Sequence, residues 1–510
     1  MGMKGIDRRG ALGILASGAA ALALESAPAL AQYGVRVRED ITTFQANATK
    51  IAALRNGVKV MQDRSTANQN DPTGWYYWAS VHGTIDPVPP ALVGIYNSCQ
   101  HGTVYFEPWH RAFLYYFEQT LRAASGDATL NLPYWDWYNT PTIPSSFTAT
   151  TTPTSAANPL WHARANNTTS GLSQAAFAAS ITNFKLPPSP GFSGSLEGNP
   201  HGTVHGEIGG DMGIVPTAGR DPIFWLHHCN IDRLWNVWLK LGGGRANPGA
   251  ADPWSNQPFT YDVGGTMTKK AGQVVDSAAM LNYKYDRDTL SKPVFPWWKY
   301  ILAYQLVAIP IPRPLPPYLL EKPRAMANMA MVERRVAVQA VSALPDKNIA
   351  LGSKSARMLF PLSPASQARL QAFAARPAQR PGGDISDVTL VLEGVQLSAQ
   401  GRNGGFSYAV CVALPAGTLD QATFDRACVG TLNSFTLSVE AQHNGDVAIR
   451  DAGYTVRIPL GAAFANLKPE QFREGVPVTF LAQHETLDAG KGPRTYITIK
   501  GAHLEFEQGQ

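Results

Sequence analysis

The spacing of six histidines constrains this chain more than any other feature of its sequence. They fall into two groups of three, and in chain order they are His82, His101, His110, His201, His205 and His228. The whole chain holds only eleven histidines, so more than half of them belong to these two groups. Neutral imidazole is a preferred ligand of copper, zinc and iron. Two sites of three histidines leave coordination positions open, so we expect something other than protein to bind between two metals.

Local patterns place ligands of both groups on helices. The apolar residues that follow His110 recur at helical spacing, at Phe113, Leu114, Phe117 and Leu121. In the second group, Asp221 followed by Pro222 is typical of a helix start. This pattern predicts a helix over 223–239 that carries His228. Rigid helices hold ligands more precisely than loops do.

The pair His201 and His205 is a weaker signal when taken alone. Two histidines four residues apart lie on one face of a helix. The HExxH pattern of zinc peptidases is absent, so that class lacks its general base. A dizinc hydrolase would need bridging carboxylates, and none stands at ligand spacing. We expect the glycine- and proline-rich segments 191–200 and 206–213 to be loops that shape the site.

Two regions of different periodicity divide the chain. Residues from about 40 to 300 are typical of helices with long polar loops, and the proline-dense stretch 309–317 predicts a stiff linker. Beyond it lie short strand-like segments, at 387–398, 406–415, 434–441, 453–460, 477–484 and 495–501. We therefore expect a mainly α catalytic domain at 32–305, a linker at 306–331, and an antiparallel β-sandwich at 332–510.

The first 31 residues predict a targeting segment. Arg8 and Arg9 precede the apolar stretch 11–24, and residues 29–31 offer a small-residue cleavage site. Paired arginines are typical of the twin-arginine route, so we expect an exported protein, periplasmic or secreted, with no membrane contact after cleavage. An uncleaved anchor is the alternative, although the apolar run is short for a bilayer span. The net charge is only +5, which argues against a nucleic-acid partner.

The four cysteines are too few for a disulfide scaffold. Cys411 and Cys428 lie in the same C-terminal region and could pair after export. Cys229 stands within an apolar helical stretch and is typical of a small buried residue. Cys99 is unusual because it is two residues from a candidate ligand.

Two stretches resemble the copper signatures of a known family. Residues 99–111 (CQHGTVYFEPWHR) resemble the first signature of tyrosinases, catechol oxidases and molluscan haemocyanins, and residues 221–233 (DPIFWLHHCNIDR) resemble the second. The resemblance spans about residues 36–290. It implies a four-helix bundle that holds two copper ions in a type-3 site, with dioxygen between them. By position it assigns His82, His101 and His110 to the first copper, and His201, His205 and His228 to the second.

The resemblance also implies roles for residues beside the ligands. His227 competes with His228 as the last ligand, and the family pattern favours His228 and leaves His227 next to the site. Phe224, one helical turn earlier, is expected to pack on a ligand ring. Cys99 has the Cys-x-His spacing at which family members join the cysteine sulfur to the histidine ring, so we expect a thioether to His101. A free buried thiol is the alternative.

Four further positions bear on the reaction. Glu197 stands where family members carry a glutamate that holds a water near the coppers, and it could help accept a phenol proton. A loop carboxylate that faces solvent is the alternative. Val215 takes the place of a phenylalanine that covers the site in many plant members, so a smaller gate should admit bulkier phenols. Gly202 argues against the hydroxylation of monophenols, because strong tyrosinases often carry an asparagine at that position. Gly206, the residue after His205, adds neither bulk nor polarity.

The resemblance therefore implies a polyphenol oxidase. We expect it to use dioxygen to oxidise o-diphenols to o-quinones and to hydroxylate monophenols at the ortho position. An oxidase of o-aminophenols and a haemocyanin-like oxygen carrier are the alternatives. The expected partners are dioxygen and small phenols, and the oligomeric state stays open, a homo-oligomer included.

Two structural features extend the resemblance. Tyr283 and Tyr285 resemble the family's closing Tyr-x-Tyr motif, which pairs with an arginine near the mature N-terminus, here Arg36 or Arg38. A cation over an aromatic face stabilises by about 0.5–2 kcal/mol. The C-terminal strands resemble, more weakly, the β-domain that covers the copper entrance in plant polyphenol oxidases. We expect a similar lid, removable by cleavage near 309–330, although no plugging side chain is identified.

Overall fold

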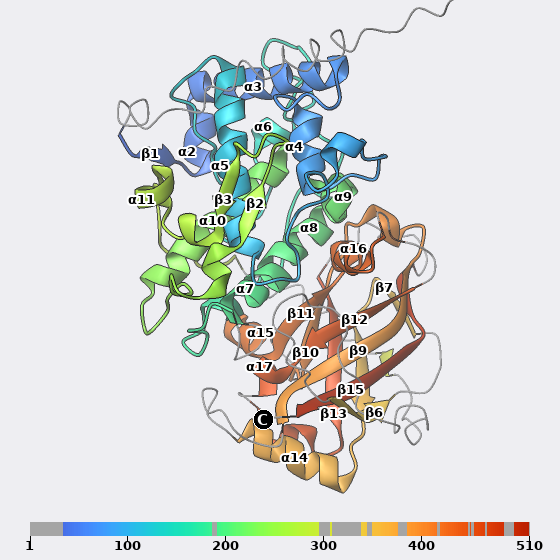
Figure 1. Cartoon of the computed structure of the whole chain (residues 1–510). Coiled ribbons are helices and arrows are strands. Elements are labelled where there is room, and N and C mark those ends of the chain that lie inside the picture. The colour runs from blue at the N-terminus through green and yellow to red at the C-terminus, as the bar shows by residue number, and fades with distance from the viewer. Residues whose placement is uncertain are drawn as a thin grey trace, which may run out of the picture.

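The computed structural model contains two regions of different architecture (Figure 1). It describes residues 34–185, 191–294, 307–308, 338–343, 349–375, 385–415, 419–446, 449, 453–464, 467–483 and 494–508. We call residues 34–294 the helical domain and residues 307–508 the sheet domain. The expected targeting segment at 1–31 and the proline-dense stretch 309–317 lie outside the described residues. The limits placed at 305 and 331 also lie outside them and stay predictions.

The helical domain is built around two long, almost fully buried helices, α5 and α10. Its helices are α2 (Ile41–Ala46), α3 (Ala48–Ala67), α4 (Trp75–His82), α5 (Phe106–Ser125), α6 (Ser145–Thr148), α7 (Gly191–Leu196), α8 (Gly202–Ile208), α9 (Val215–Ala218), α10 (Pro222–Lys240) and α11 (Ser277–Leu281). Helix α5 packs between α3 and α10. The ring of Phe117 on α5 stacks on Trp225 of α10 with centroids 3.3 Å apart, which fixes the two helices against each other.

The start of α10 and the end of α5 follow from local chemistry. The Asp221 side chain accepts a hydrogen bond from the backbone N–H of Ile223 at 2.9 Å, and Pro222 occupies the first turn of α10, as the sequence predicts. Helix α5 ends at Gly126, whose φ of 71° lies in the left-handed region that favours glycine. Among the described residues, no helix combines the length and the apolar character that crossing a bilayer requires.

Two predictions of loops are wrong. The segment 191–200 contains α7 and most of a π-helical segment, Glu197–His201, that leads into α8. Helix α8 continues through Gly206 to Ile208. Glycine is a poor helix former, but tertiary packing overrides that preference here because Phe192 and Ile208 are completely buried in the helical domain.

The sheet domain is a β-sandwich, as predicted. Its strands are β5 (Val307–Ala308), β6 (Val338–Ala343), β7 (Ile349–Gly352), β8 (Ala356–Phe360), β9 (Ile385–Leu397), β10 (Tyr408–Val412), β11 (Cys428–Leu432), β12 (Tyr454–Pro459), β13 (Val476–Ala482), β14 (Thr495–Ile499) and β15 (Gly501–Gln508). One sheet has the order β11-β10-β13-β8-β5, and the other β6-β15-β9-β14-β7 with β12 beside β9. The pairs are antiparallel except for β5 with β8. A disulfide joins Cys411 to Cys428 across β10 and β11.

Among the described residues four helices accompany these strands, and one of them lies where the sequence predicts a strand. They are α14 (Pro364–Ala374), α15 (Gln421–Ala427), α16 (Ser434–His443) and α17 (Gly461–Phe464). Segment 434–441 was expected to be a strand because its apolar residues alternate. It forms α16 instead, since Asn433 caps it: the Asn433 side chain accepts from the Thr436 N–H at 3.0 Å, and the Thr436 hydroxyl accepts from the Asn433 N–H at 2.8 Å.

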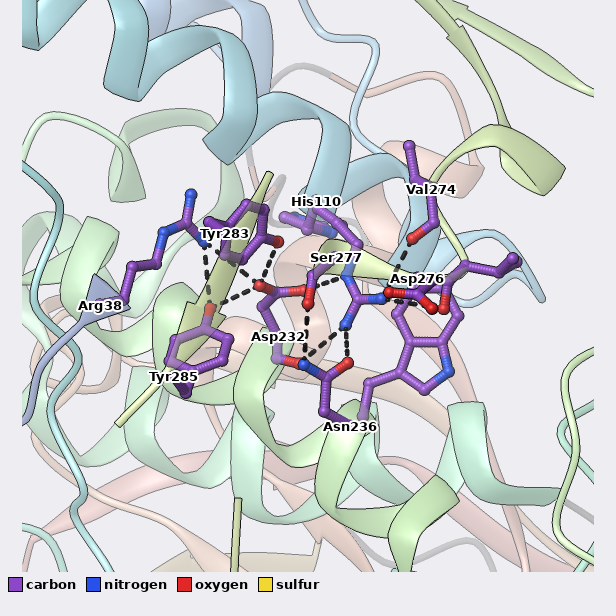
Figure 2. Close-up of polar contacts among 12 residues, drawn as sticks. Arg38, His110, Asp232, Asn236, Val274, Asp276, Ser277, Tyr283 and Tyr285 are labelled. Atoms are coloured by element: carbon purple, nitrogen blue, oxygen red, sulfur yellow. Dashed lines mark hydrogen bonds and ion pairs between the residues drawn. The ribbon is translucent and has the colours of Figure 1, made fainter. Parts of the chain in front are cut away.

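A buried charge cluster closes the helical domain at its chain ends (Figure 2). Strand β1 (Arg36–Arg38) pairs in parallel with β4 (Tyr283–Tyr285). The Arg38 guanidinium lies 3.8 Å from the Tyr283 ring centroid, so Arg38 is the arginine that the Tyr-x-Tyr motif pairs with. Asp232 on α10 accepts from Arg38, Tyr283 and Tyr285 at 3.2, 2.6 and 2.5 Å, and also from Arg111. Burial raises the pKa of Asp232, but Arg111 and Arg38 outweigh burial and hold it below its usual range.

The remaining short strands lie at the surface of the helical domain. Strand β2 (Pro258–Thr260) pairs antiparallel with β3 (Thr268–Lys270). Beside this hairpin, the buried hydroxyl of Tyr261 donates to the backbone oxygen of Trp109 on α5 at 2.8 Å. The hairpin is thereby tied to the helix that carries His110.

Candidate metal centre

The six predicted histidines converge in the interior of the helical domain. His82 ends α4, His110 lies in the first turns of α5, and His228 lies on α10. His201 caps α8 and His205 lies within it. His101 alone stands outside a helix, in the turn that precedes α5. All six side chains are at most 2% exposed. Four helices and one turn therefore bring together residues up to 146 positions apart in the chain.

Backbone carbonyls orient four of these imidazoles. In each case Nδ1 lies at hydrogen-bonding distance from an oxygen: His82 from Val215 (3.1 Å), His110 from Phe106 (2.8 Å), His201 from Glu197 (3.1 Å) and His205 from Met212 (2.8 Å). A carbonyl oxygen only accepts, so Nδ1 carries the proton in each ring and Nε2 keeps its lone pair. This is how metal-binding histidines are usually held.

The histidines fit a pair of metal ions. The Nε2 atoms of His82, His101, His110 and His201 are buried and have no hydrogen-bond partner among the described residues. A buried polar nitrogen without a partner is costly unless something else binds it. Burial lowers the pKa of all six rings, to about 3 for His110 and His205, so they are neutral at physiological pH. Neutral imidazoles with free Nε2 atoms are what two divalent cations would take as ligands.

Distances alone do not divide the histidines into the two predicted groups. Donor atoms within 4.8 Å of one another form three overlapping sets: His201, His205, His227 and His228; His82, His110 and His228; and His82, Cys99 and His101. The two rings of His110 and His228 stack with centroids 4.4 Å apart, at the boundary between the groups. The division into first- and second-metal ligands therefore stays a proposal, as does the choice between His227 and His228.

Phe224 lies between the two groups. Its ring centroid is 4.3 Å from that of His228 and 4.7 Å from that of His82. One apolar ring thus restrains a ligand of each group. The sequence predicted only the contact with His228, which lies on the same helix as Phe224. Such packing limits the rotation of both imidazoles.

Cys99 lies beside the one ligand that no helix supports. Its Sγ is 3.3 Å from Nδ1 of His101. The thiol is buried, and burial raises its pKa to about 12. His101 thus lacks the carbonyl contact that orients four of the other rings, and a sulfur takes that place.

Two carboxyl groups lie near the histidines. Glu197 accepts a hydrogen bond from the Gly102 N–H at 2.6 Å. This bond ties its carboxyl group to the turn that carries His101, whereas a solvent-facing loop carboxylate would make no such contact. Burial, together with a smaller contribution from the neighbouring Glu107, raises the pKa of Glu197 to about 8. Nearby metal cations would lower this value. The sequence analysis did not identify Glu107, which is fully buried on α5 and accepts from the Ser193 hydroxyl at 2.5 Å.

A helix of the sheet domain, α16, packs against α8 and α9 of the helical domain (Figure 1). The Phe435 ring, at the start of α16, stacks on His205 with centroids 4.0 Å apart and planes 15° apart. It also meets the rings of His101 and His201 edge to face, at 5.5 and 5.3 Å. Phe435 is 1% exposed and belongs to the core of the helical domain, although it comes from the other domain.

Polar groups of α16 hold the loops around the ligands. Gln442 donates from its amide to Sγ of Cys99 at 3.2 Å, and His443 Nε2 lies 2.9 Å from the backbone oxygen of His101. The Ser438 hydroxyl accepts from the N–H of Val215 at 2.8 Å. Val215 is the residue whose carbonyl contacts His82, so these polar groups hold the surroundings of two ligands of the first group, while Phe435 of the same helix covers His205 of the second.

The two glycines singled out beside the ligands lie at this domain boundary. Asn433 donates from its side chain to the backbone oxygen of Gly202 at 2.8 Å. A Cβ on Gly206 would come within 2.2 Å of the Asn433 amide nitrogen, so any side chain there would collide with the sheet domain. At Gly202 a Cβ would make only ordinary contacts, the nearest at 3.4 Å. Gly206 is thus required by the fit of the two domains.

The contribution of α16 to the site was not predicted from the sequence. Phe435, Ser438, Gln442 and His443 stand in a segment whose alternating apolar residues favour a strand. The only local signal for a helix was the Asn433 and Thr436 pair that forms the capping box. No pattern in the sequence relates residue 435 to His205, because their contact depends on how the two domains pack.

Comparison with known proteins agrees with this geometry. Residues 72–171 and 144–241 match the family model described as the common central domain of tyrosinase. A tyrosinase of Hahella sp., HcTyr1, is 34% identical over 47% of this chain and 60% of its own length. A chloroplastic polyphenol oxidase of Malus domestica is 27% identical over 66% of this chain and 59% of its own. The chain thus spans about three fifths of the length of these two relatives.

A solved structure has the same fold over most of the chain. It is a latent aurone synthase, a polyphenol oxidase, with a TM-score of 0.50 at 18% identity, covering 94% of this chain and 90% of the other. Proteins of the tyrosinase family hold two copper ions in a type-3 site, and the buried histidines of this chain fit such a pair. The chain therefore carries the central domain of the tyrosinase and polyphenol oxidase family of type-3 copper proteins.

Proposed function

We propose that this protein is a polyphenol oxidase that uses dioxygen to oxidise small phenols at two copper ions. The observation that carries the proposal is a set of buried histidine Nε2 atoms that have no hydrogen-bond partner among the described residues and lie close to one another. His82, His101 and His110 would hold the first copper, and His201, His205 and His228 the second. Bound copper would supply the electron transfer between dioxygen and the phenol. The reaction removes two electrons and two protons from an o-diphenol and gives an o-quinone.

The protein's own residues would handle the phenol and its proton. Glu197 is fixed by Gly102 next to the ligand turn, so its carboxylate is in place to orient a water or take the phenol proton. Val215 is the proposed gate, and its small side chain supports access for bulky phenols. Gly202 offers no amide to assist Glu197, which favours o-diphenol oxidation over the hydroxylation of monophenols. We infer both activities, with the first one faster.

The sheet domain acts as a lid in this proposal. Phe435 occupies the space over His205, His201 and His101, where a phenol ring would have to approach. Closure therefore excludes substrate by occupying its site with an aromatic ring of similar size. Cleavage within 309–330 should raise the rate of catechol oxidation at constant copper content. A cleaved protein that is no faster would mean that the sheet domain serves another purpose.

The proposed thioether would join Cys99 to the ring of His101. Its formation breaks the S–H bond and one ring C–H bond, makes one C–S bond, and passes two electrons and two protons to dioxygen. A clamp of this kind would replace the carbonyl contact that His101 lacks. Intact-mass measurement after disulfide reduction tests it, because the crosslinked chain is lighter by two hydrogen atoms. The mass of the unmodified chain would mean a free thiol.

Oxygen uptake by the copper-loaded protein tests the main proposal. The intact and the cleaved chain are each given catechol, a monophenol and an o-aminophenol, and quinone colour is recorded alongside oxygen consumption. Catechol turnover by the cleaved chain is the expected result. Reversible oxygen binding without turnover would indicate a carrier, and faster turnover of the aminophenol would indicate the related oxidase.

We also propose that the protein is exported through its paired arginines. Arg8 and Arg9 precede the apolar stretch, and the twin-arginine route carries folded proteins, which suits an enzyme that binds copper before export. Replacing both arginines by lysine should retain the protein in the cytoplasm. Unchanged export of that variant would contradict this route.

A further inference from the structure

A seventh histidine lies against the second group of ligands. His227 is fully buried on α10, and its ring is nearly parallel to that of His201 at a centroid distance of 5.3 Å. The donor atoms of His201, His205, His227 and His228 lie within 4.8 Å of one another, which is close enough to share one ion. By distance alone, the second metal could take four histidine ligands, so oxygen or a phenol would have to bind as a fifth ligand at a more crowded ion.

The indole of Trp137 changes that count. Its Nε1–H donates to Nδ1 of His227 across 3.1 Å, and both side chains are buried. An indole nitrogen donates and never accepts. Nδ1 of His227 therefore holds a lone pair, and the ring proton sits on Nε2. A nitrogen that carries a proton has no lone pair to offer a metal.

His201 and His205 show the opposite arrangement. Their Nδ1 atoms donate to backbone oxygens at 3.1 and 2.8 Å, which leaves the Nε2 lone pair free for a metal. The difference lies in the partner, since a carbonyl accepts where an indole donates. Partners of this kind are known to set the tautomer of histidines in metal sites.

Only one contact holds the proton of His227 on Nε2. That atom is buried and has no acceptor among the described residues. Without the indole, the proton would gain nothing by staying on Nε2, and a metal nearby would favour its move to Nδ1. The Trp137 hydrogen bond is therefore what separates His227 from a ligand.

We propose that Trp137 fixes the tautomer of His227 and so excludes it from the ligand set, which keeps the second metal at three protein ligands with a position open. Trp137 is a positioning residue, because it acts through His227 and touches no reacting atom. The inference rests on the proposed metal site and explains why that site retains room for oxygen and phenol although four imidazoles are within reach.

Cobalt(II) in place of copper provides the test, because four-coordinate cobalt(II) absorbs visible light more strongly than five-coordinate cobalt(II). The full chain is freed of metal, loaded with cobalt(II), and its bound ions and absorption are measured. We expect Trp137→Phe to keep two ions and to lose visible absorption per ion, as His227 becomes a fourth ligand. His227→Gln should keep the wild-type absorption, and the double variant should regain it.

A neighbouring tryptophan supplies the matched control. Trp135 donates its indole N–H to the oxygen of Thr140 at 2.8 Å, so Trp135→Phe loses a similar bond without touching His227. It should leave the absorption of the cobalt protein unchanged. An unchanged Trp137→Phe spectrum would overturn the inference. So would a His227→Gln protein that binds one ion, and this second result decides the matter even if Trp137→Phe fails to fold.

The failure of this inference differs from a failure of the proposed function. Wild-type protein that binds fewer than two cobalt ions would contradict the metal site itself. Two bound ions with a spectrum that does not respond to Trp137→Phe would leave the metal site intact and refute only the role of Trp137.

Discussion

The two domains contribute opposite kinds of surface to one site. The helical domain supplies the six buried imidazoles, four of which have an Nε2 atom without a hydrogen-bond partner among the described residues. The sheet domain supplies the ring of Phe435, which stacks on His205, and the amide of Gln442, which donates to Cys99. The difference shows that the candidate ligands come from one domain and the ring that covers them from the other. Substitutions in each domain can therefore test the two contributions separately.

Removing a ligand from the helical domain should have the largest effect. His228→Ala takes away an imidazole at the boundary of both groups, and we expect the loss of at least one copper per chain. Activity should fall by more than about 100-fold, the upper range for changes to residues that merely support ligands. Metal analysis and oxygen uptake measure both effects. His162→Ala is the control, because that histidine bonds Asp211 at 2.7 Å outside the site. Two coppers retained by His228→Ala would refute its assignment.

The charge cluster at Asp232 should matter next, through stability. Asp232→Asn leaves the buried guanidinium groups of Arg38 and Arg111 without their counter-charge, and breaking a buried pair costs about 3–5 kcal/mol. Denaturant unfolding of the full chain measures the change. Asp63→Asn is the control, because its pair with Lys59 is exposed and contributes only about 0.3–0.5 kcal/mol. Equal effects of the two variants would contradict the role given to the cluster.

Removing the Phe435 ring that covers the site should act in the opposite direction and raise activity. Phe435→Ala deletes the ring that stacks on His205. If this lowers the free energy that favours the closed over the open position of the sheet domain by about 1.4 kcal/mol, the open population rises tenfold. We expect catechol oxidation by the uncleaved chain to rise by about that factor at constant copper content. Val439→Ala lies on the same helix, has no ring contact with the histidines, and should leave the rate nearly unchanged. A Phe435→Ala protein as slow as the wild type would show that this ring does not limit access.

The gate should have the smallest effect, confined to large substrates. Val215→Phe narrows the approach to the metal site on the side of the helical domain. A change of this size in a binding pocket alters the discrimination between a large and a small substrate by about tenfold. The ratio of kcat/KM for a bulky phenol to that for catechol, measured on the cleaved chain, should fall. An unchanged ratio would mean that access is set by the sheet domain alone.

The sequence predicted the parts that short-range chemistry determines. Asp221 and Pro222 start α10 where expected, and the alternating segments at 387–398 and 406–415 form strands of the sandwich. The six histidines meet because the helices that carry them pack together in the core, and the apolar spacing after His110 predicted one of these helices.

The rest depended on contacts that no local pattern contains. Residues 434–441 alternate like a strand, yet the Asn433 cap and packing against the other domain make them α16. Gly206 looked neutral for activity, and its role emerges only because Asn433 fills the space where a side chain would be. Likewise, Trp137 is one aromatic among many until its N–H is seen to meet His227.

The most direct test of the account is the copper content of the purified full chain. Six buried imidazoles in two groups predict two copper ions per chain, both lost from the protein when a strong chelator is added and both regained on copper addition. A single ion at saturation, or two ions retained when His110 and His228 are both replaced by alanine, would contradict the central claim that these histidines hold a copper pair.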